Sequence, residues 1–391
     1  VYFTKLNNSY DPLPRKLKQL NSFDYNMLVQ DSKGIYWLYF FLRGSHECRL
    51  TSYNPATGAI AHYPGLANNF LYYSSIYNDP ENRLWICAVD FQNKINIYQV
   101  DKQTGKPTGS WQVPSDNRVW GNSYVMQWWQ DVHRVFWLAT VNGLCSFDFI
   151  HNKWKRWLHK ENDSSSISTN WLYTLCPDPA EPQHYLWLGS SGSGFDKFDM
   201  LTGKCVKHYS TTDGLPNNVV YGILPDDAGN LWMSTNKGLS CFNPASKEFR
   251  NFTQEDGLFG DEFNHFQFKK LNNGDLLFGG VGGFTAFTPS IVLQKQKAVP
   301  VVFTGLSISN KPVNWKQDSG ILSAPVGYAK NITLQPGQNI FTISFASLEY
   351  RSNKKKFYKY KLDGFDKHYT EPSNKNEATY TNLSPGTYTF H

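Results

Sequence analysis

The sequence predicts an all-β fold, a β-propeller followed by an immunoglobulin-like β-sandwich, and three observations support this prediction. An aromatic residue recurs within strand-like stretches at spacings of 48, 52, 50, 45 and 46 residues. Aromatic residues, which β-strands favour, make up 16% of the 391 residues, and charged residues only 18% against about 25% in an average chain. After Pro289 the repeat gives way to short stretches that alternate at period two. A repeat period in the forties is typical of a propeller or an array.

Each repeat contains the same four strand-like parts, and its clearest copy runs from Tyr221 to Pro244. Four antiparallel strands per repeat make one propeller blade. A single blade cannot bury both of its faces, so we expect the recurring aromatic residue of the second strand to fill the space between neighbouring blades. These aromatic residues are Trp37, Trp85, Trp137, Trp187, Trp232 and Phe278.

The two ends of the repeat region indicate how the ring of blades closes. The last repeat lacks a fourth strand before residue 293, while the chain begins with an extra strand-like stretch at 1–6. A strand missing at one end and spare at the other predicts that the N-terminal stretch completes the last blade. We therefore expect six blades, and seven stay open as an alternative if a further segment precedes Val1.

The turn between the first and second strands of each repeat carries Asp, Asn, Gly and Pro. Examples are 31–34, 79–82 and 226–229. These residue types tolerate positive φ or bond their own backbone, as tight hairpins require. We therefore expect the acidic residues in these turns, Asp31, Asp79, Glu81, Asp226 and Asp227, to stabilise the turns rather than to catalyse.

The domain boundary is expected near residue 292, with a propeller over 1–292 and an incomplete immunoglobulin-like sandwich over 293–391. Short strands at regular spacing, separated by Gly, Pro and Asn, are typical of a β-sandwich. The expected strands are 301–308, 332–334, 340–345, 357–362, 378–383 and 386–390.

Charge and composition exclude several classes of protein. The net charge of +6 is mild for this length, and neither a dense basic stripe nor a nucleic-acid-binding motif is present, so nucleic-acid binding is not expected. No run of about 18 apolar residues exists that could span a membrane. The chain has no initiator Met and no signal peptide, so we interpret it as a fragment of a longer protein.

The six cysteines are scattered without a CxxC pair, which argues against a zinc cluster and favours free buried thiols. The ten histidines show no metal-ligand spacing. No Gly-x-Ser-x-Gly elbow and no phosphate-binding loop is present either. We therefore expect neither a cofactor, a metal nor a catalytic site.

A ligand is expected at one end of the central channel, on the loops that enter the first strand of each blade and on the turns between second and third strands. Aromatic rings there could cover the apolar face of a sugar, while Asn, Lys and Arg bond its hydroxyl or acid groups. First-strand aromatics can also simply pack the propeller centre, and a packed side chain is the plain alternative for His265. The candidate ligand-binding residues are Arg43, Tyr72, Trp120, Asn122, Tyr124, Trp171, Tyr173, Asn218, Lys237 and His265.

Two parts of the chain resemble known modules. The stretches 209–218 and 226–244 resemble the linker and the repeat of the two-component regulator propeller. The stretches 358–369 and 378–390, rich in tyrosine, resemble the "YYY" module that follows such propellers.

The resemblance implies the periplasmic sensor region of a hybrid two-component system of the Bacteroidetes type. In that family two propellers precede the Tyr-rich module, and a transmembrane helix then leads to a histidine kinase. The resemblance therefore implies a non-catalytic sensor fragment, one propeller plus part of the module, that binds an oligosaccharide, neutral or acidic. It implies a homodimer in the whole sensor, membrane attachment only through a missing C-terminal helix, and regulation of glycan-utilisation genes.

Two other functions stay open from the sequence. The chain could be a carbohydrate-active propeller enzyme, which product formation from a glycan panel would reveal. It could instead be a protein-interaction scaffold without a sugar site.

Overall fold

The computed structural model describes residues 4–7, 23–42, 48–63, 70–90, 94–113, 125–294, 300–348 and 356–391. The chain divides into two compact units, Val1–Val292 and Leu293–His391. Helix in these ranges is limited to the short 3₁₀ turn η2 (Gln254–Asp256) and to α2 (Pro289–Val292). Within the same ranges, no helix has the length and apolar character needed to cross a membrane.

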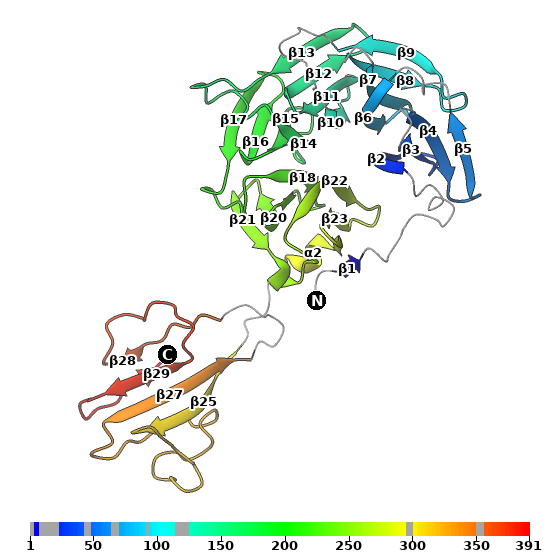
Figure 1. Cartoon of the computed structure of the whole chain (residues 1–391). Helices are drawn as coiled ribbons and strands as arrows, with labels where there is room; N and C mark the ends of the chain where they lie inside the picture. The colour runs from blue at the N-terminus through cyan, green and yellow to red at the C-terminus, as the bar shows by residue number, and fades with distance from the viewer. Residues whose placement is uncertain are drawn as a thin grey trace. The chain divides into compact units, whose positions relative to one another are not determined.

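The described part of the first unit forms six four-stranded antiparallel sheets, as the repeat predicts. Successive sheets contact one another through their first strands, in chain order from the blue to the yellow part of Figure 1. The six-bladed propeller predicted from the sequence is therefore confirmed. Its strands are β2 (Phe23–Gln30), β3 (Tyr36–Leu42), β4 (Cys48–Asn54) and β5 (Ala59–Tyr63); β6 (Phe70–Asn78), β7 (Leu84–Asp90), β8 (Ile95–Val100) and β9 (Pro107–Gln112); β10 (Val125–Gln130), β11 (Val135–Thr140), β12 (Gly143–Asp148) and β13 (Lys153–Trp157); β14 (Leu172–Pro177), β15 (Tyr185–Ser190), β16 (Phe195–Asp199) and β17 (Lys204–Tyr209); β18 (Val220–Pro225), β19 (Leu231–Thr235), β20 (Gly238–Asn243) and β21 (Glu248–Phe252); and β22 (Phe263–Lys270), β23 (Leu276–Gly280), β24 (Gly283–Phe287) and β1 (Thr4–Asn7).

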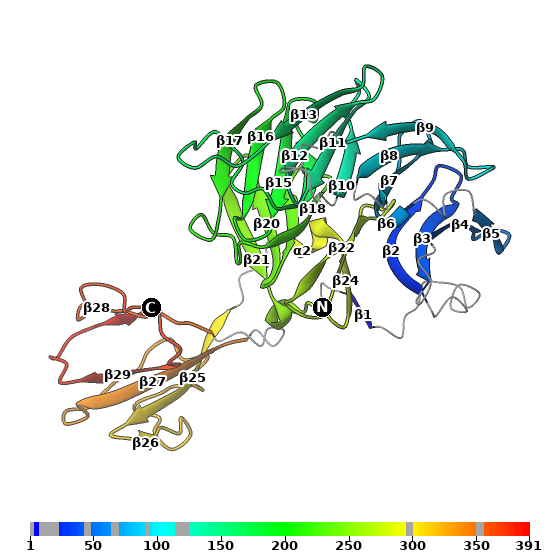
Figure 2. The same cartoon turned by 45° about the horizontal axis from the view of Figure 1, so that its top comes forward.

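The last blade is completed by the N-terminal strand. β1 pairs with β24 antiparallel, with Thr4 opposite Ala286 and Asn7 opposite Gly283. Figure 2 shows the blue β1 beside β24. The spare strand at the start of the sequence thus replaces the strand that the last repeat lacks, as expected.

The recurring aromatic residues are buried, with relative exposures of 0–6%. The five tryptophans pack against the core of the next blade, whereas Phe278 stacks on Phe287 of its own blade. The ring centroid of Trp85 lies 4.8 Å from that of Phe136 in the third blade. The ring of Trp232 lies 4.6 Å from Phe287 in the last blade. The predicted filling of the space between blades is therefore confirmed for the tryptophans.

A hydrogen bond ties each of the five tryptophans to the turn that precedes its strand. The indole Nε1–H donates to a carboxylate oxygen at 2.8–3.1 Å. In the first turn, the other oxygen of the same carboxylate accepts backbone N–H bonds from Lys33 and Ile35. The expectation that Asp31, Asp79 and Asp226 stabilise their turns is confirmed. The five pairs are Asp31–Trp37, Asp79–Trp85, Asp131–Trp137, Asp178–Trp187 and Asp226–Trp232.

In the last blade both members of the pair change together. Leu271 takes the place of the aspartate, since its N–H bonds the carbonyl of Asp275 as the N–H of Asp226 bonds that of Asn230. Phe278 takes the place of the tryptophan, and its phenyl ring has no N–H to donate. A carboxylate at this position would lack the indole partner that the other five turns provide, and Leu271 itself is 39% exposed.

Two of the turn carboxylates have a lowered pKa. For both Asp31 and Asp178, burial is the largest single influence and raises the pKa, but the hydrogen bonds together outweigh it. These bonds come from Trp37 and Lys102 to Asp31, and from backbone N–H groups to Asp178. The folded state therefore favours the ionised form of both groups.

The second unit is a small antiparallel β-domain. One sheet has the order β26 (Lys311–Pro312), β25 (Val301–Ile308), β27 (Ile340–Ser347) and β29 (Glu377–Thr381). β28 (Leu362–Asp363) pairs with β30 (Thr389–Phe390). The buried side chains of Phe341, Ile343, Phe345, Ala378 and Tyr380 form its core together with Leu362 and others.

Two strands expected in this unit are not formed. The stretch 332–334 makes only an isolated bridge between Ile332 and Leu322. The stretch 357–362 makes a bridge from Tyr358 to Ser373 and scattered backbone bonds to Thr370 and His391, and a strand begins only at Leu362 in β28. The facing segment contains Pro372, which has no N–H to continue a ladder.

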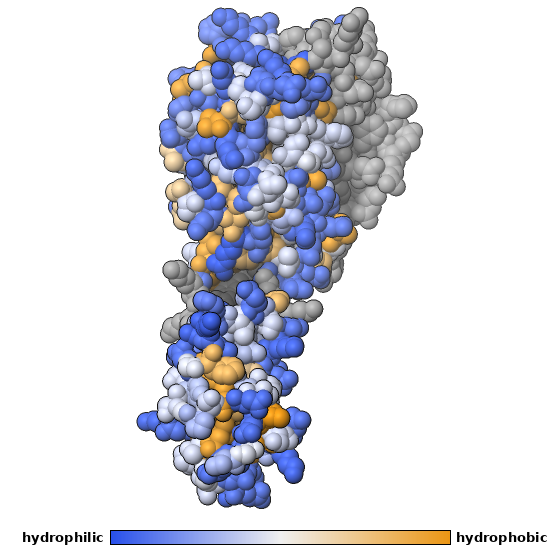
Figure 3. Space-filling model, turned by 90° about the vertical axis from the view of Figure 1, so that its left-hand side faces the viewer, coloured by the Kyte–Doolittle hydropathy of each residue, from blue (hydrophilic) through white to orange (hydrophobic). Residues whose placement is uncertain are grey.

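The surface keeps some large apolar side chains, which Figure 3 shows in orange among mostly hydrophilic residues on both units. Exposed phenylalanines of the second unit include Phe357 and Phe365. Scattered exposure of this kind is normal for a folded chain and indicates no partner by itself.

Trp232→Ala is expected to destabilise the propeller by about 3–5 kcal/mol, because it removes a fully buried ring between two blades. Trp232→Phe keeps most of the ring and should cost less, about 1–3 kcal/mol, for the lost bond to Asp226. Thermal or urea unfolding measures both. Trp171→Ala, at an exposed tryptophan of the same unit, is the control, and equal losses from Trp171 and Trp232 would contradict the blade packing.

Asp178→Asn is expected to lower stability at neutral pH by about 1 kcal/mol, because it weakens a set of hydrogen bonds to a buried carboxylate. Since the folded pKa of Asp178 is lowered, this contribution is complete above the unfolded value of about 3.9 and is lost as pH falls through the folded value. Melting curves of both proteins from pH 7 to pH 3 should therefore converge in acid. A constant difference across this range would refute the assignment.

Candidate functional site

The first strands of consecutive blades share a β-bulge close to their beginning. In β14, Leu172 pairs with Ser190 and Thr174 with Gly189, so Tyr173 has no partner between them. Tyr221 in β18 and Met126 in β10 are skipped in the same way. A bulge takes a side chain out of the regular alternation and re-aims it, and bulges are frequent beside binding sites.

The bulged tyrosines belong to a group of rings that we call the aromatic cluster: Trp171, Tyr173, Tyr221, His265 and Phe266. The ring centroids of Tyr173 and Tyr221 lie 5.2 Å apart. The imidazole of His265 is stacked on Tyr173 at 5.8 Å with an interplanar angle of 8°. Trp171 meets Tyr173 edge to face at 6.2 Å, and Phe266 meets His265 at 4.6 Å. Three neighbouring blades thus contribute rings from the entrances of β14, β18 and β22.

The aromatic cluster is open to solvent on one side. Trp171 is 50% exposed and Phe266 is 40% exposed, although both contact other rings. The hydroxyl of Tyr221 donates to Oδ1 of Asn236 at 2.9 Å. Lys237, the next residue of that turn, is exposed. The cluster therefore combines exposed ring faces with polar groups at its edge.

The electrostatics of the cluster favour neutral groups. Burial lowers the pKa of His265, so its neutral imidazole is favoured. Neither ring nitrogen of His265 has a hydrogen-bond partner among the described residues. A neutral imidazole offers one donor and one acceptor to a ligand. The pKa of Tyr221 is raised, mainly by burial, and the charge of Glu262 acts in the same direction.

Phe266 has a left-handed backbone, with φ of 62°, inside an irregular part of β22. Phe263 pairs with Gly280 and Phe268 with Phe278, and the residues between them do not follow the ladder. A bulky residue at positive φ is an outlier that costs about 1–3 kcal/mol. Such strain is kept most often at binding sites.

Backbone bonds hold the loops of this region to one another. The N–H of Gly194 donates to the carbonyl of Asn218 at 2.8 Å, and that of Gly238 to the carbonyl of Asp261 at 2.7 Å. Both glycines have positive φ, 78° and 87°. A Cβ at Gly238 would lie 2.0 Å from the carbonyl oxygen of Phe252, so only glycine fits. The turns that follow β15 and β19 are thus fixed against the loops that enter the next blades.

The structure brings three of the predicted ligand-binding residues together: Trp171, Tyr173 and His265. Lys237 lies in the turn beside them. Asn218 serves the loop instead, because its side-chain oxygen accepts the N–H of Thr211 at 2.9 Å. A ligand role for any of these five residues stays a prediction.

The other predicted residues cannot be placed in the cluster. Arg43, Trp120, Asn122 and Tyr124 lie outside the described residues. The backbone of Tyr72 belongs to β6, but its side chain is not among the parts of the chain that the structure describes. Tyr221 and Phe266 were not among the ligand-binding residues predicted from the sequence. Tyr221 could have been found because it occupies the same repeat position as Tyr173, whereas no sequence signal announces the backbone of Phe266.

A second polar group lies on β16 and β17. Asp196, Cys205 and His208 each have one atom of a kind that can ligate a metal ion, and these three atoms lie within 4.8 Å of one another. Nδ1 of His208 is 2.7 Å from Oδ1 of Asp196, and Nε2 is 2.8 Å from the carbonyl oxygen of Ser164. Both ring nitrogens are therefore engaged in hydrogen bonds, and burial raises the pKa of the Cys205 thiol, which stays protonated. The group is a hydrogen-bonded pair of a buried carboxylate and a partly exposed imidazole, with a neutral thiol beside it.

The cysteines that the structure describes fit the expectation of buried thiols. Cys145, Cys176, Cys205 and Cys241 are buried and free. Burial raises the pKa of Cys145, Cys176 and Cys241 to about 12, so these thiols are unreactive at neutral pH.

Comparison with known families matches two parts of the chain. Residues 214–237 match the two component regulator propeller, and residues 349–391 match the Y_Y_Y domain. This chain carries both modules. The resemblance noted from the sequence is thus confirmed, together with the propeller that the repeats predict.

A relative with a named activity covers part of the chain. Histidine kinase P4 of Formosa agariphila is 30% identical over 199 residues, which are 51% of this chain and 14% of that protein. The chain is therefore a homologue of a small portion of a histidine kinase.

Solved structures with a similar course of the chain include two from B. thetaiotaomicron. The extracellular domain of a putative hybrid two component system is 19% identical, with a TM-score of 0.46, and the match covers 100% of this chain and 54% of that one. The extracellular domain of a putative one component system is 16% identical, with a TM-score of 0.43, covering 94% of this chain and 66% of that one. The chain spans only part of each of these proteins.

Phe266→Gly is expected to leave the melting temperature unchanged or to raise it, because glycine adopts positive φ without strain. Phe268→Gly, two residues later in a paired part of the same strand, is the matched comparison and should destabilise the unit. Thermal unfolding of the two variants decides the matter. If Phe266→Gly were as destabilising as Phe268→Gly, the ring of Phe266 would be needed for folding rather than held in place for a ligand.

Proposed function

We propose that this chain is the ligand-sensing part of a two-component system protein, that it lies in the periplasm, and that it binds an oligosaccharide without catalysing a reaction. The two matched modules and the homology to part of a histidine kinase support the assignment to signal transduction. The oligosaccharide is the finer part of the proposal, and it rests on the aromatic cluster.

The aromatic cluster is the observation that carries the ligand proposal. Exposed rings such as Trp171 offer flat apolar faces that suit the C–H face of a sugar ring. His265 is exposed and its ring nitrogens have no hydrogen-bond partner among the described residues, so these nitrogens and the amide of Asn236 can bond hydroxyl groups of the sugar. One cation, Lys237, and one anion, Glu262, accompany them, so the described part of the site favours a neutral sugar over a strongly acidic one.

Signalling requires that the ligand distinguishes two states of the sensor. A ligand shifts an equilibrium only by the difference in its affinity for the two states. We propose that the whole sensor is a homodimer and that binding at the propeller changes how the Y_Y_Y domains of the two subunits are spaced. The kinase that follows in the longer protein would then regulate glycan-utilisation genes.

A carbohydrate-active enzyme is the alternative that the site allows least. Glycosidases place two carboxylates about 5–9.5 Å apart across the scissile bond. The turn carboxylates Asp31, Asp79 and Asp226 are bonded to buried tryptophans. Among the described residues, Glu262 is the one carboxylate whose charge raises the pKa of Tyr221, and one carboxylate suits binding better than hydrolysis.

A thermal-shift screen of this chain against neutral and acidic oligosaccharides tests the proposal. A ligand at 100 times its dissociation constant should stabilise the propeller by about 2.7 kcal/mol. Trp171→Ala and Tyr173→Ala should each weaken binding by about tenfold, since aromatic side chains dominate binding energy, while their own melting temperatures change little. Trp315→Ala, at a partly exposed tryptophan of the second unit, is the control and should bind as the wild type does.

Three results would count against the proposal. Absence of a shift with every glycan class would argue that the site is not in this chain. Equal weakening by Trp315→Ala would argue against the aromatic cluster as the site. Release of products from any glycan of the panel would establish the enzyme instead.

A further inference from the structure

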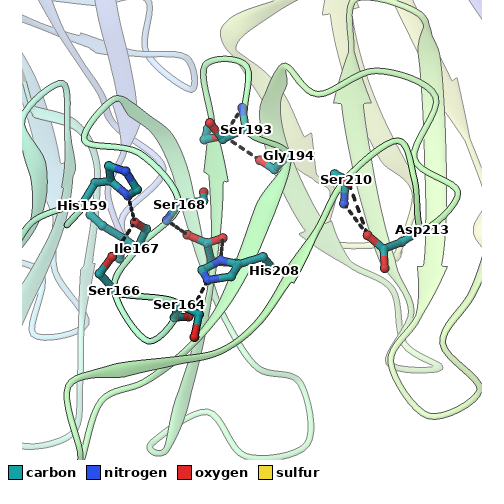
Figure 4. Close-up of polar contacts among 12 residues, drawn as sticks. His159, Ser164, Ser166, Ile167, Ser168, Ser193, Gly194, His208, Ser210 and Asp213 are labelled. Atoms are coloured by element: carbon teal, nitrogen blue, oxygen red, sulfur yellow. Dashed lines mark hydrogen bonds and ion pairs between the residues drawn. The ribbon is translucent and has the colours of Figure 1, made fainter. Parts of the chain in front are cut away.

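The loop that leads into the aromatic cluster is held by β16 and β17. This loop, residues 158–170, ends directly before Trp171. The N–H of Ser168 donates to Oδ2 of Asp196 at 2.8 Å. The carbonyl of Ser164 accepts from Nε2 of His208 at 2.8 Å, as Figure 4 shows. The N–H of Cys205 donates to the carbonyl of Ser165 at 2.8 Å. Two of these three contacts depend on the pair Asp196 and His208.

Asp196 and His208 face each other directly across the two strands. The carboxylate of Asp196 is fully buried, whereas the side chain of His208 is 35% exposed. Nδ1 of the imidazole faces a carboxylate oxygen and Nε2 faces a backbone carbonyl, and both of these oxygens can only accept. Two N–H donors exist only in the imidazolium form. A neutral His208 could keep one of these contacts, and the other would bring two lone pairs together.

We propose that His208 and Asp196 form a proton-dependent latch that holds loop 158–170 and thereby positions Trp171 at the aromatic cluster. With His208 protonated, both contacts are made and the loop is fixed. On loss of the proton, either the bond to Ser164 or the bond to Asp196 is lost, and the buried carboxylate loses its cation. The role in ligand binding rests on the proposed function, but the latch itself needs no ligand.

The charges around His208 favour the closed latch. The hydrogen bond from His208 to Asp196 is the largest influence and raises the pKa of His208, while burial and Lys207 oppose it. The further titratable groups nearby are Cys205, whose thiol is neutral, and Asp163, whose charge reaches Cys205. Since the folded pKa is raised, the latch is fully closed below the ordinary histidine value of about 6.5 and opens as pH rises through the folded value.

His159 of the same loop shows why a contact to a carbonyl alone does not make a latch. Its Nδ1 lies 2.8 Å from the carbonyl oxygen of Ile167, as Figure 4 shows. A neutral imidazole with its proton on Nδ1 makes this bond equally well. His208 differs because both of its nitrogens need a proton.

The position of Trp171 can be followed by fluorine NMR of the whole chain labelled with 5-fluorotryptophan, with its signal assigned by Trp171→Phe. We expect this signal to move between pH 5.5 and pH 9 with a single midpoint above about 6.5. Hydrogen exchange of the peptide spanning loop 158–170, corrected for intrinsic rates, should be roughly fivefold faster above the midpoint, at the low end of typical coupling effects. A Trp171 signal that does not move while His208 titrates would overturn the proposal.

Two variants and a control separate the latch from general effects of pH. His208→Gln should abolish the movement of the Trp171 signal. Asp196→Asn should keep the loop closed across the whole range, because the amide can donate to neutral Nδ1 and accept from Ser168 while Nε2–H stays on Ser164. His151→Gln removes a solvent-exposed His–Asp pair, with His151 65% exposed, and should leave the titration intact.

The outcomes distinguish this proposal from the proposed function. A movement that persists in His208→Gln with the same midpoint refutes the latch, and so does a normal titration in Asp196→Asn. If the latch behaves as expected but no oligosaccharide binds, the latch stands and the proposed ligand fails.

Discussion

The propeller depends on one repeated interaction, the bond from a buried tryptophan to the aspartate of its own turn. The indole fills the space between two blades, and its N–H would be costly to bury without a partner. The aspartate provides that partner and, with its other oxygen, holds the turn in shape, as Asp31 does for Lys33 and Ile35. One carboxylate therefore links the conformation of a hairpin to the packing of neighbouring blades. The last blade drops both members together, which supports the view that they act as a unit.

The rigid outer frame allows irregular backbone at the centre. The first strands are bulged at Tyr173 and Tyr221, and Phe266 keeps a strained backbone, although each departure from a regular ladder costs free energy. The surrounding blades can hold these features because the turns beside them are fixed by bonds such as that from Gly238 to Asp261. A binding site built on such a frame is pre-organised, and little ordering remains to be done when a ligand arrives.

Features that recur in the sequence could be predicted, and features that occur once could not. The spacing of the tryptophans was sufficient to predict the blades. The missing strand at one end of the repeat region and the spare strand at the other were sufficient to predict that β1 closes the propeller. The side-chain roles at the centre were harder. Tyr173 lies in β14 and joins the aromatic cluster because a bulge turns it. Asn218 lies in the loop before β18 and bonds Thr211 instead. The strand expected at 357–362 is not formed because the segment facing it contains Pro372, which has no N–H to continue the ladder. The pattern within 357–362 does not show which segment it will face. Pairing between distant segments is what a local pattern does not contain.

The pairing of β1 with β24 has a consequence for how this unit must fold. Residues 4–7 meet residues 283–286, so one hydrogen-bonded ladder joins the two ends of the whole propeller. Contacts of such long sequence separation form late, because the loop they close is costly in entropy. Until then β24 presents an open edge, a surface on which strands of other molecules can pair. The propeller is thus most exposed to aggregation until β1 pairs with β24.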